Sequence, residues 1–368
     1  MNFLGIVFIS YIGWSVCILY IALILFSIFQ WRSNAQVNAD ESKLKPCSIL
    51  IPYRNEAKNL PGLLDSLDSI PIDKSRVEIL LIDDHSEDES TAFIKTRIKT
   101  NYILQQADGI GKKKAIDTGI SIAKFDTIFQ LDADGTFGKR WFYSLQKRLN
   151  SGIDFLTGII SIKNPQGWLE HFQLFELMAL MGMTNAGIKS GYWHMANGAN
   201  MAYPKKLYRQ ISNPAHAAHS SGDDMFLIEE ARRQKLNIDF NKDRDGIVYT
   251  QPVSNLKTLI HQRLRWASKN SELNSLHLKW ILFSVILFNI SLIILPFIHS
   301  GYAVLWIIKL LVDLIYLLVL SKDFSTTIKW LYYPVSALFY PLFIGYIGLL
   351  HMVRYRFSWK GRLSDSQR

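Results

Sequence analysis

Charged residues are absent from two long stretches of the chain and frequent between them. Residues 1–31 and 281–308 contain no Asp, Glu, Lys or Arg, whereas residues 32–275 mix apolar runs with polar ones. A bilayer core about 30 Å thick needs roughly 20 apolar residues to be crossed by a helix. The pattern therefore predicts a membrane protein with a water-exposed domain between its membrane segments.

Four apolar segments are long enough to be membrane spans: Phe3–Phe29, Leu278–Ile298, Tyr302–Leu320 and Trp330–Val353. The first lacks the basic leader of a cleaved signal peptide, so we expect a retained anchor. It closes with Trp31 and Arg32, which are typical of a membrane boundary. The third carries Lys309 and Asp313 on one helix face, which predicts an ion pair or contacts with other helices.

Basic residues crowd the edges of these segments, and the formal net charge is +10. This placement favours a cytoplasmic membrane surface, and no basic stripe with interleaved aromatic residues indicates a nucleic acid partner. We therefore expect a plasma membrane protein of a bacterium with an outside N-terminus and a cytoplasmic domain. Three crossings after that domain would leave the basic tail outside. Pro334 and Pro341 favour a re-entrant or interfacial last segment, so the crossing count stays open.

Apolar runs and helical patterns alternate in the middle of the chain. The predicted buried strands are Cys47–Pro52, Val77–Ile82, Tyr102–Gln105 and Thr127–Leu131. The predicted helices between them are Glu56–Leu67, Ser90–Lys99 and Lys112–Ala123. Strands without polar alternation, separated by helices, predict an α/β fold with a doubly wound, mostly parallel sheet covered by helices.

Polar side chains follow three of these strands. They form the clusters Tyr53–Glu56, Asp83–Asp84 and Asp132–Asp134. Ligands of parallel sheets bind at the carboxyl ends of the strands, so we expect the clusters to share one site. Grouped carboxylates favour a cation, and Asp132 with Asp134 suits Mg²⁺ or Mn²⁺ bound to a diphosphate. Asp83 by itself is better explained as a turn or cap residue.

Six segments, in this order, resemble glycosyltransferase family 2. They are SILIPYRNE (48–56), LLIDDHSEDES (80–90), GKKKAIDTGI (111–120), QLDADG (130–135), GDDMFL (222–227) and QRLRW (262–266). The resemblance covers about Pro46 to Trp266 and implies the GT-A fold. It also implies an inverting transfer of a sugar from a nucleotide-sugar, with a divalent metal as cofactor.

The resemblance also implies roles for residues at the strand ends. Pro52, Tyr53, Arg54 and Glu56 would line the nucleotide pocket, and Asp84 would bind the base, which is usually uracil in this family. Lys112 would lie near the nucleotide. Asp134 would bind the metal, and Asp132 would contact both the metal and the sugar-nucleotide.

Two later motifs would complete the site. Asp224 matches the general base of the family, although many members have Glu-Asp where this chain has Asp223 and Asp224. Either carboxylate could therefore be the base. Gln262, Arg265 and Trp266 would close over the diphosphate and the acceptor, and a guanidinium suits a diphosphate because it donates as a planar fork. Trp266 could equally be an anchor at the membrane boundary.

We therefore expect a hexosyltransferase acting on a UDP-linked sugar and a hydroxyl of a lipid or membrane-associated glycan acceptor. A processive polysaccharide synthase is the alternative, and a non-catalytic membrane scaffold is the alternative of another class. The apolar, Met-rich residues 165–190 predict a core helix or an interfacial helix that feeds a lipid acceptor. His216 and His219 favour a gating loop over a metal site. The expected regions are an anchor (1–31), a catalytic domain (46–250), an interfacial helix (251–275), membrane helices (276–353) and a basic cytoplasmic tail (354–368).

Overall fold

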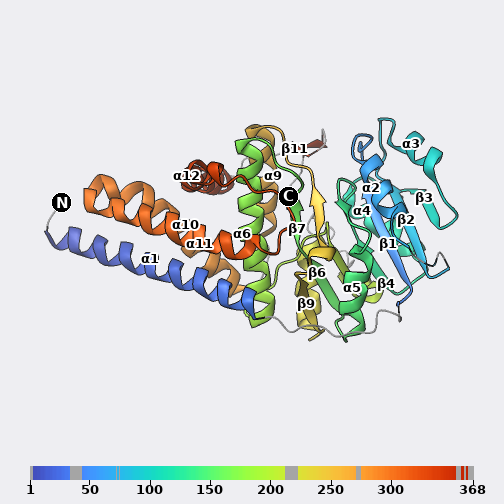
Figure 1. The fold of residues 1–368 in the computed structure, drawn as a ribbon, viewed down its shortest axis with the longest axis horizontal. Helices are drawn as coiled ribbons and strands as arrows, with labels where there is room; N and C mark the ends of the chain where they lie inside the picture. The colour runs from blue at the N-terminus through green and yellow to red at the C-terminus, as the bar shows by residue number, and fades with distance from the viewer. Residues whose placement is uncertain are drawn as a thin grey trace.

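The computed structural model describes residues 3–33, 44–71, 73, 75–211, 223–270, 275–353, 358–359 and 362–363. His216 and His219 lie outside the described residues, and Asp223 is described only in its backbone. The molecule is elongated, with long apolar helices at one end and a sheet covered by helices at the other (Figure 1). The segregation of charge along the sequence is thus a segregation in space.

The central sheet has seven strands in the order β3-β2-β1-β4-β8-β6-β9. Its strands are β1 (Cys47–Tyr53), β2 (Val77–Asp83), β3 (Tyr102–Gln106), β4 (Thr127–Gln130), β6 (Phe155–Gly158), β8 (Met201–Pro204) and β9 (Ile238–Asn241). Strands β3, β2, β1 and β4 run parallel, whereas β8 is antiparallel to both of its neighbours. Every residue of β1 and β2 is buried. The predicted fold class, a mostly parallel sheet between helices, is confirmed.

Helices on this sheet are α2 (Leu60–Asp68), α3 (Ser90–Arg97), α4 (Lys112–Ile122), α5 (Trp141–Asn150), α7 (Lys205–Ile211) and α8 (Asp223–Arg233). The helix predicted from Glu56 begins four residues later, at Leu60. Asn55 has a positive φ of 51°, and its backbone N–H donates to Ser86. The segment before Leu60 is therefore held against the loop after β2 and does not adopt a helical conformation.

A small second sheet, β5-β10-β7, lies beside the carboxyl ends of the main strands. Its strands are β5 (Thr136–Phe137), β7 (Ile160–Ile162) and β10 (Val248–Thr250), and a short 3-10 helix, η2 (Arg244–Gly246), precedes β10. Because β5 directly follows the Asp132–Asp134 cluster, its pairing with β10 brings the end of β10 next to those carboxylates.

Two helices separate the sheet from the membrane helices: α6 (Trp168–Ser190) and α9 (Leu256–Asn270). Helix α6 is largely buried and ends at Gly191, whose φ of 74° is favourable for glycine. The prediction of a core helix within residues 165–190 is confirmed. Helix α9 carries the Gln262, Arg265 and Trp266 motif.

Within the described ranges, four helices are long and apolar enough to cross a membrane. They are α1 (Phe3–Arg32), α10 (Leu276–Ile298), α11 (Val304–Ser321) with the short 3-10 helix η3 (Ser300–Ala303) before it, and α12 (Tyr333–Met352) with η4 (Trp330–Tyr332) before it. Lys309 and Asp313 form the predicted ion pair, and Lys309 is 1% exposed. The Tyr20 hydroxyl of α1 donates to Asp313 at 2.6 Å, so the pair also joins two helices.

Trp31, which closes the first apolar segment, is packed inside the protein. Its side chain is only 2% exposed, and its indole N–H donates to the Asp323 carboxylate at 2.7 Å. Phe324 stacks on the ring, and the Lys242 ammonium lies 5.0 Å from the ring centroid. Trp31 therefore joins the end of α1 to the segment after α11 and to the sheet domain.

Candidate active site

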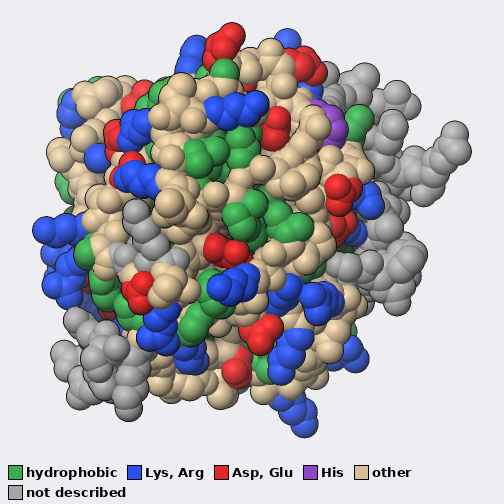
Figure 2. Space-filling view, turned by 90° about the vertical axis from the view of Figure 1, so that its right-hand side faces the viewer, with side chains coloured by type: hydrophobic (Ala, Val, Ile, Leu, Met, Phe, Trp, Pro, Cys, Tyr) green, Lys and Arg blue, Asp and Glu red, His purple; other side chains and the backbone are tan. Residues whose placement is uncertain are grey.

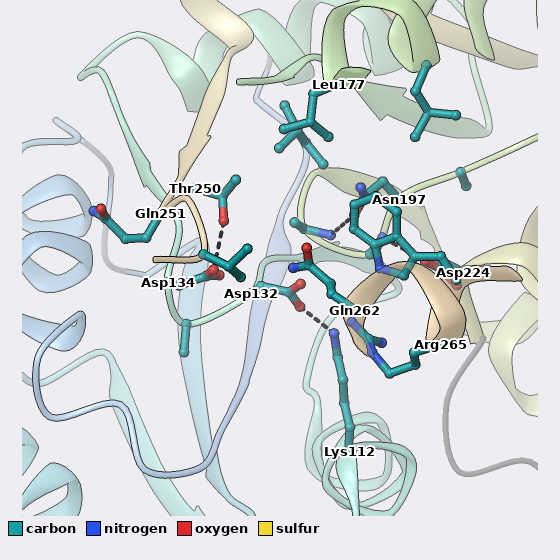
Figure 3. Close-up of a pocket in the computed structure, with 18 of the residues that line it drawn as sticks. Lys112, Asp132, Asp134, Leu177, Asn197, Asp224, Thr250, Gln251, Gln262 and Arg265 are labelled. Carbon is teal, nitrogen blue, oxygen red and sulfur yellow. Dashed lines mark hydrogen bonds and ion pairs between the residues drawn. The ribbon is translucent and has the colours of Figure 1, made fainter. Parts of the chain in front are cut away.

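One cavity of about 500 Å³ lies between the carboxyl ends of the strands and helices α6 and α9. In Figure 3, Asp134 lies at the left and Asp224 and Arg265 lie at the right, with Asp132, Gln262 and Lys112 between them. Twelve residues that were predicted from the sequence line it: Pro52, Tyr53, Arg54, Glu56, Asp84, Lys112, Asp132, Asp134, Asp224, Gln262, Arg265 and Trp266. The expectation that the polar clusters share one site is met by the geometry.

Asp132 and Asp134 have different partners. Asp132 forms an ion pair with Lys112 from the first turn of α4, whereas Asp134 accepts a hydrogen bond of 2.7 Å from the Thr250 hydroxyl. Burial, followed by the charges of Asp132 and Glu56, raises the pKa of Asp134 from 3.8 to about 6. Two carboxylates at this spacing are suitable ligands for a divalent cation.

The two neighbouring aspartates after β2 behave differently. Asp84 lines the cavity, is 1% exposed, and accepts a hydrogen bond of 2.6 Å from the backbone N–H of Gly111. Gly111 has a φ of 110°, a conformation that favours glycine. Asp83 instead accepts hydrogen bonds from the Ser86 N–H and the Thr91 hydroxyl, as predicted for a turn residue.

Arg54 holds the loop that follows β2. Its guanidinium donates to the carbonyls of Asp84 and His85 at 3.0 and 2.8 Å, and to the Glu87 carboxylate at 3.0 Å. The side chain is almost fully buried. Arg54 therefore lines the cavity as predicted, and it also fixes the position of Asp84.

Asp224 lies in the first turn of α8 and is held by two backbone donors. Its carboxylate accepts hydrogen bonds from the Gly198 N–H at 3.2 Å and from its neighbour Met225 at 3.0 Å. Gly198 belongs to a turn at residues 197–200, which is closed by a hydrogen bond from the Asn200 N–H to the Asn197 carbonyl. The turn lines the cavity and orients Asp224.

Helix α9 presents its motif to the cavity through a second layer of contacts. Arg263 donates to both oxygens of Glu176 on α6 at 2.7–3.0 Å, and its guanidinium lies 4.1 Å from the Trp266 ring centroid. Trp266 lines the cavity, as the acceptor-site interpretation requires. Burial lowers the pKa of Arg265, whereas Asp132 and Asp224 oppose that shift, so the guanidinium lies among carboxylates.

Part of the remaining cavity surface is apolar. Leu177, Leu180 and Met181 of α6 contribute to it together with Met195 and Val253. Helix α6 also packs closely against α11. Tyr316 of α11 lies so near the Gly182 backbone that a side chain at position 182 would collide with it. The cavity and the membrane helices therefore share one helix.

Several lining residues were not predicted from the sequence. Thr250 and Gln251 at the end of β10 and Thr184 of α6 are the clearest examples. Glu176, which holds α9 through Arg263, was missed as well. No local pattern marks them, because their neighbours in space lie far away in the chain.

Parallel strands that deliver carboxylates to one edge, covered by a helix with the Q-x-x-R-W motif, are the arrangement of the GT-A fold. The family model described as "Glycosyl transferase family 2" matches residues 48–212 of this chain. A mannosyltransferase from Pyrobaculum calidifontis, solved in complex with GDP-Man and Mn²⁺, shares the fold. It superposes with a TM-score of 0.59 at 13% identity, covering 95% of this chain and 98% of that one.

Two curated relatives show how far the similarity extends in sequence. A probable glycosyltransferase from Sulfolobus acidocaldarius is 24% identical over 75% of this chain and 60% of its own length. A poly-beta-1,6-N-acetyl-D-glucosamine synthase from Staphylococcus epidermidis is 22% identical over 64% of this chain and 57% of its own length. This chain thus spans about 60% of the length of these relatives.

Proposed function

We propose that this chain transfers a sugar from a nucleotide-sugar, UDP-linked in the first instance, to a hydroxyl of a lipid or membrane-associated acceptor. The observation that carries this proposal is the composition of the cavity. Its strand-end wall offers carboxylates and cations, while its α6 wall is mostly apolar and shared with the membrane helices. A charged donor and an apolar acceptor would therefore meet in one space. The domain boundaries expected from the sequence, and a cytoplasmic catalytic domain in a bacterial plasma membrane, belong to the same proposal.

A divalent cation fits the strand-end wall. Burial and the neighbouring charge of Asp132 raise the pKa of Asp134, as expected for carboxylates held close together. Among the described residues, no three His, Cys, Asp or Glu side chains gather as a metal site. Magnesium-type sites commonly use one or two carboxylates and complete the shell with phosphate and water. Asp134 and Asp132 would hold the ion, which when bound would neutralise charge on the diphosphate.

The side chains of this chain then have separable roles. Asp224 would take the proton of the acceptor hydroxyl, because a hydroxyl is a poor nucleophile without a positioned base. The hydroxyl oxygen bonds to the anomeric carbon as the bond to the diphosphate oxygen breaks, and the diphosphate leaves with the electron pair. Arg265 and Lys112 would bind its developing charge. A single displacement inverts the anomeric configuration.

The test is a transfer assay in membranes with labelled UDP- and GDP-sugars, followed by partition of the products between organic solvent and water. Label in the organic phase supports transfer to a lipid. Label in a large polymer would instead support the processive synthase, to which the similarity with the Staphylococcus protein draws attention. Bound nucleotide without any product would support the scaffold. Asp224→Asn membranes are the control for background transfer.

A further inference from the structure

Helix α12 differs in direction from the other three apolar helices. In Figure 1, α1, α10 and α11 lie lengthwise beside one another, whereas α12 is seen nearly end-on. Its axis therefore crosses theirs steeply. By length and composition α12 could span a membrane, but its direction is not that of the other three.

The segment that leads into α12 is fastened to the sheet domain. After α11, the Thr326 hydroxyl donates to the Ile162 carbonyl of β7 at 2.8 Å. The backbone N–H of Lys329 then donates to the His171 imidazole of α6 at 3.1 Å. Helix α12 therefore begins on the side of the membrane that holds the sheet domain.

The segment that leaves α12 returns to the same side. Strand β11 (Ser358–Trp359) follows Met352 by six residues and lies against α9 (Figure 1). Six residues reach at most ~22 Å when fully extended, which is less than the roughly 30 Å of a hydrocarbon core. A chain that had crossed the membrane at Met352 could not touch α9 at Ser358. Both ends of α12 thus lie on one side.

The outward face of α12 is nevertheless fully apolar. Its exposed side chains recur every three or four residues: Val335, Leu338, Leu342, Tyr346 and Leu349, each 48–59% exposed. The opposite face packs Phe343 and Ile347 against Leu259 and Leu264 of α9. An unbroken apolar stripe of this length favours an apolar partner over water. Helix α12 contacts α10 and α11, whose exposed faces also carry large apolar side chains, so the same lipid phase can cover all three.

We propose that α12 lies in the plane of the membrane, with this stripe among the acyl chains of the leaflet on the catalytic-domain side, and that α1, α10 and α11 make the three crossings. The proposal does not depend on the chemistry proposed above. It places the C-terminal tail on the same side as the catalytic domain, which is where its basic residues predict it. It also seats the α9 motif directly on a lipid-bound helix.

Depth measurements with spin labels test this arrangement. Single cysteines at Val335, Leu342 and Leu349 would carry the label in vesicles of phosphatidylcholine and phosphatidylglycerol. The native Cys17 and Cys47 are 1% and 0% exposed, so the introduced thiols are labelled selectively. Ile307, Leu311 and Ile315 of α11 are matched controls, since they are also apolar and 53–58% exposed.

We expect the three α12 labels to lie at one shallow depth, within about one helical turn of ~5 Å, while the α11 labels differ by ~12 Å. A crossing α12 would separate Val335 from Leu349 by ~21 Å along the membrane normal, with Leu342 deepest. That result would overturn the proposal, as would labels that face water. A protease-sensitive tag after Arg368 gives an independent check, because cleavage from the side opposite the catalytic domain contradicts it as well.

Discussion

The two walls of the cavity are built in different ways. The strand-end wall carries charge at the end of β4 and at the start of α4, with Lys112, Asp132 and Asp134 at its centre. The facing wall is mostly apolar and belongs to α6, with Leu177 and Leu180 among its lining residues. We therefore expect substitutions in the first wall to change the rate of the chemical step, and substitutions in the second to change the binding of the acceptor.

The walls also differ in what supports them. Every residue of β1 and β2 is buried, so the strand-end wall rests on the rigid sheet. Helix α6 is held against the membrane helices, where the Tyr316 hydroxyl of α11 donates to the Ala179 carbonyl at 3.2 Å. The charged wall is thus positioned by the soluble domain, and the apolar wall is positioned by the membrane part. Four predictions test this contrast.

The largest effect is expected at Asp224. We predict that Asp224→Asn lowers kcat by roughly 10²–10⁴-fold, because the amide cannot take the acceptor proton. The amide keeps an oxygen for one of the two backbone donors, Gly198 and Met225, so the fold should survive. Timed transfer assays, with donor binding measured in parallel, would distinguish a loss of kcat from a loss of the fold. Glu229→Gln on the same helix is the control, and an unchanged kcat in Asp224→Asn would remove the base assignment.

The next effect concerns the cation. We predict that Asp134→Ala loses Mn²⁺ binding, followed by the Mn²⁺ electron paramagnetic resonance signal, and that transfer falls by at least ~100-fold. A chelator should stop the wild-type reaction, and added Mg²⁺ or Mn²⁺ should restore it. Asp245→Ala is the control, since that carboxylate is half-exposed and pairs with Arg140 at the surface. Full Mn²⁺ binding by Asp134→Ala would place the ion elsewhere.

A smaller effect is expected from the apolar wall. We predict that Leu180→Gln raises the KM for a lipid acceptor by about tenfold, because burying an apolar side chain stabilises by roughly 1.5–3 kcal/mol. At saturating acceptor kcat should stay within about twofold, and Leu180→Met should resemble the wild type. A fall in kcat with an unchanged KM would show that this wall serves the chemical step, which would break the contrast.

The charged wall was largely predictable because its signals are local. A buried strand followed by acidic residues is visible in the sequence, and parallel strands place such residues at one edge. The different roles of Asp83 and Asp84 could also be predicted. Asp83 was expected to be a turn residue, and it does accept a hydrogen bond from Ser86. The water-exposed face of the sheet domain, with mixed charges and small apolar patches, likewise agrees with the sequence pattern (Figure 2).

The partners that hold the site together were not predictable. Thr250 meets Asp134 across 116 residues, and Arg263 meets Glu176 across 87. These are common residue types whose partners depend on the tertiary fold. The partners of Trp31 were missed for the same reason, since the rule for membrane boundaries cannot show that Asp323 bonds to it. The direction of α12 could not be predicted either, because a hydropathy pattern gives the length and polarity of a segment and not its orientation.

The smallest effect is expected behind the apolar wall, at His194, which follows α6. Burial and the nearby Arg232 lower its pKa from 6.5 to about 4. The folded protein therefore excludes a proton that the unfolded chain binds, so stability should fall as the pH falls from about 6.5 toward 4. We predict that His194→Gln removes roughly 1–2 kcal/mol of this loss at pH 5, while transfer at neutral pH is unchanged. Thermal unfolding in detergent between pH 4.5 and 7, compared with the wild type, would measure it. Identical pH profiles for the wild type and His194→Gln would mean that His194 is solvated in the folded protein. A loss of transfer in His194→Gln would mean that His194 contributes to the cavity wall.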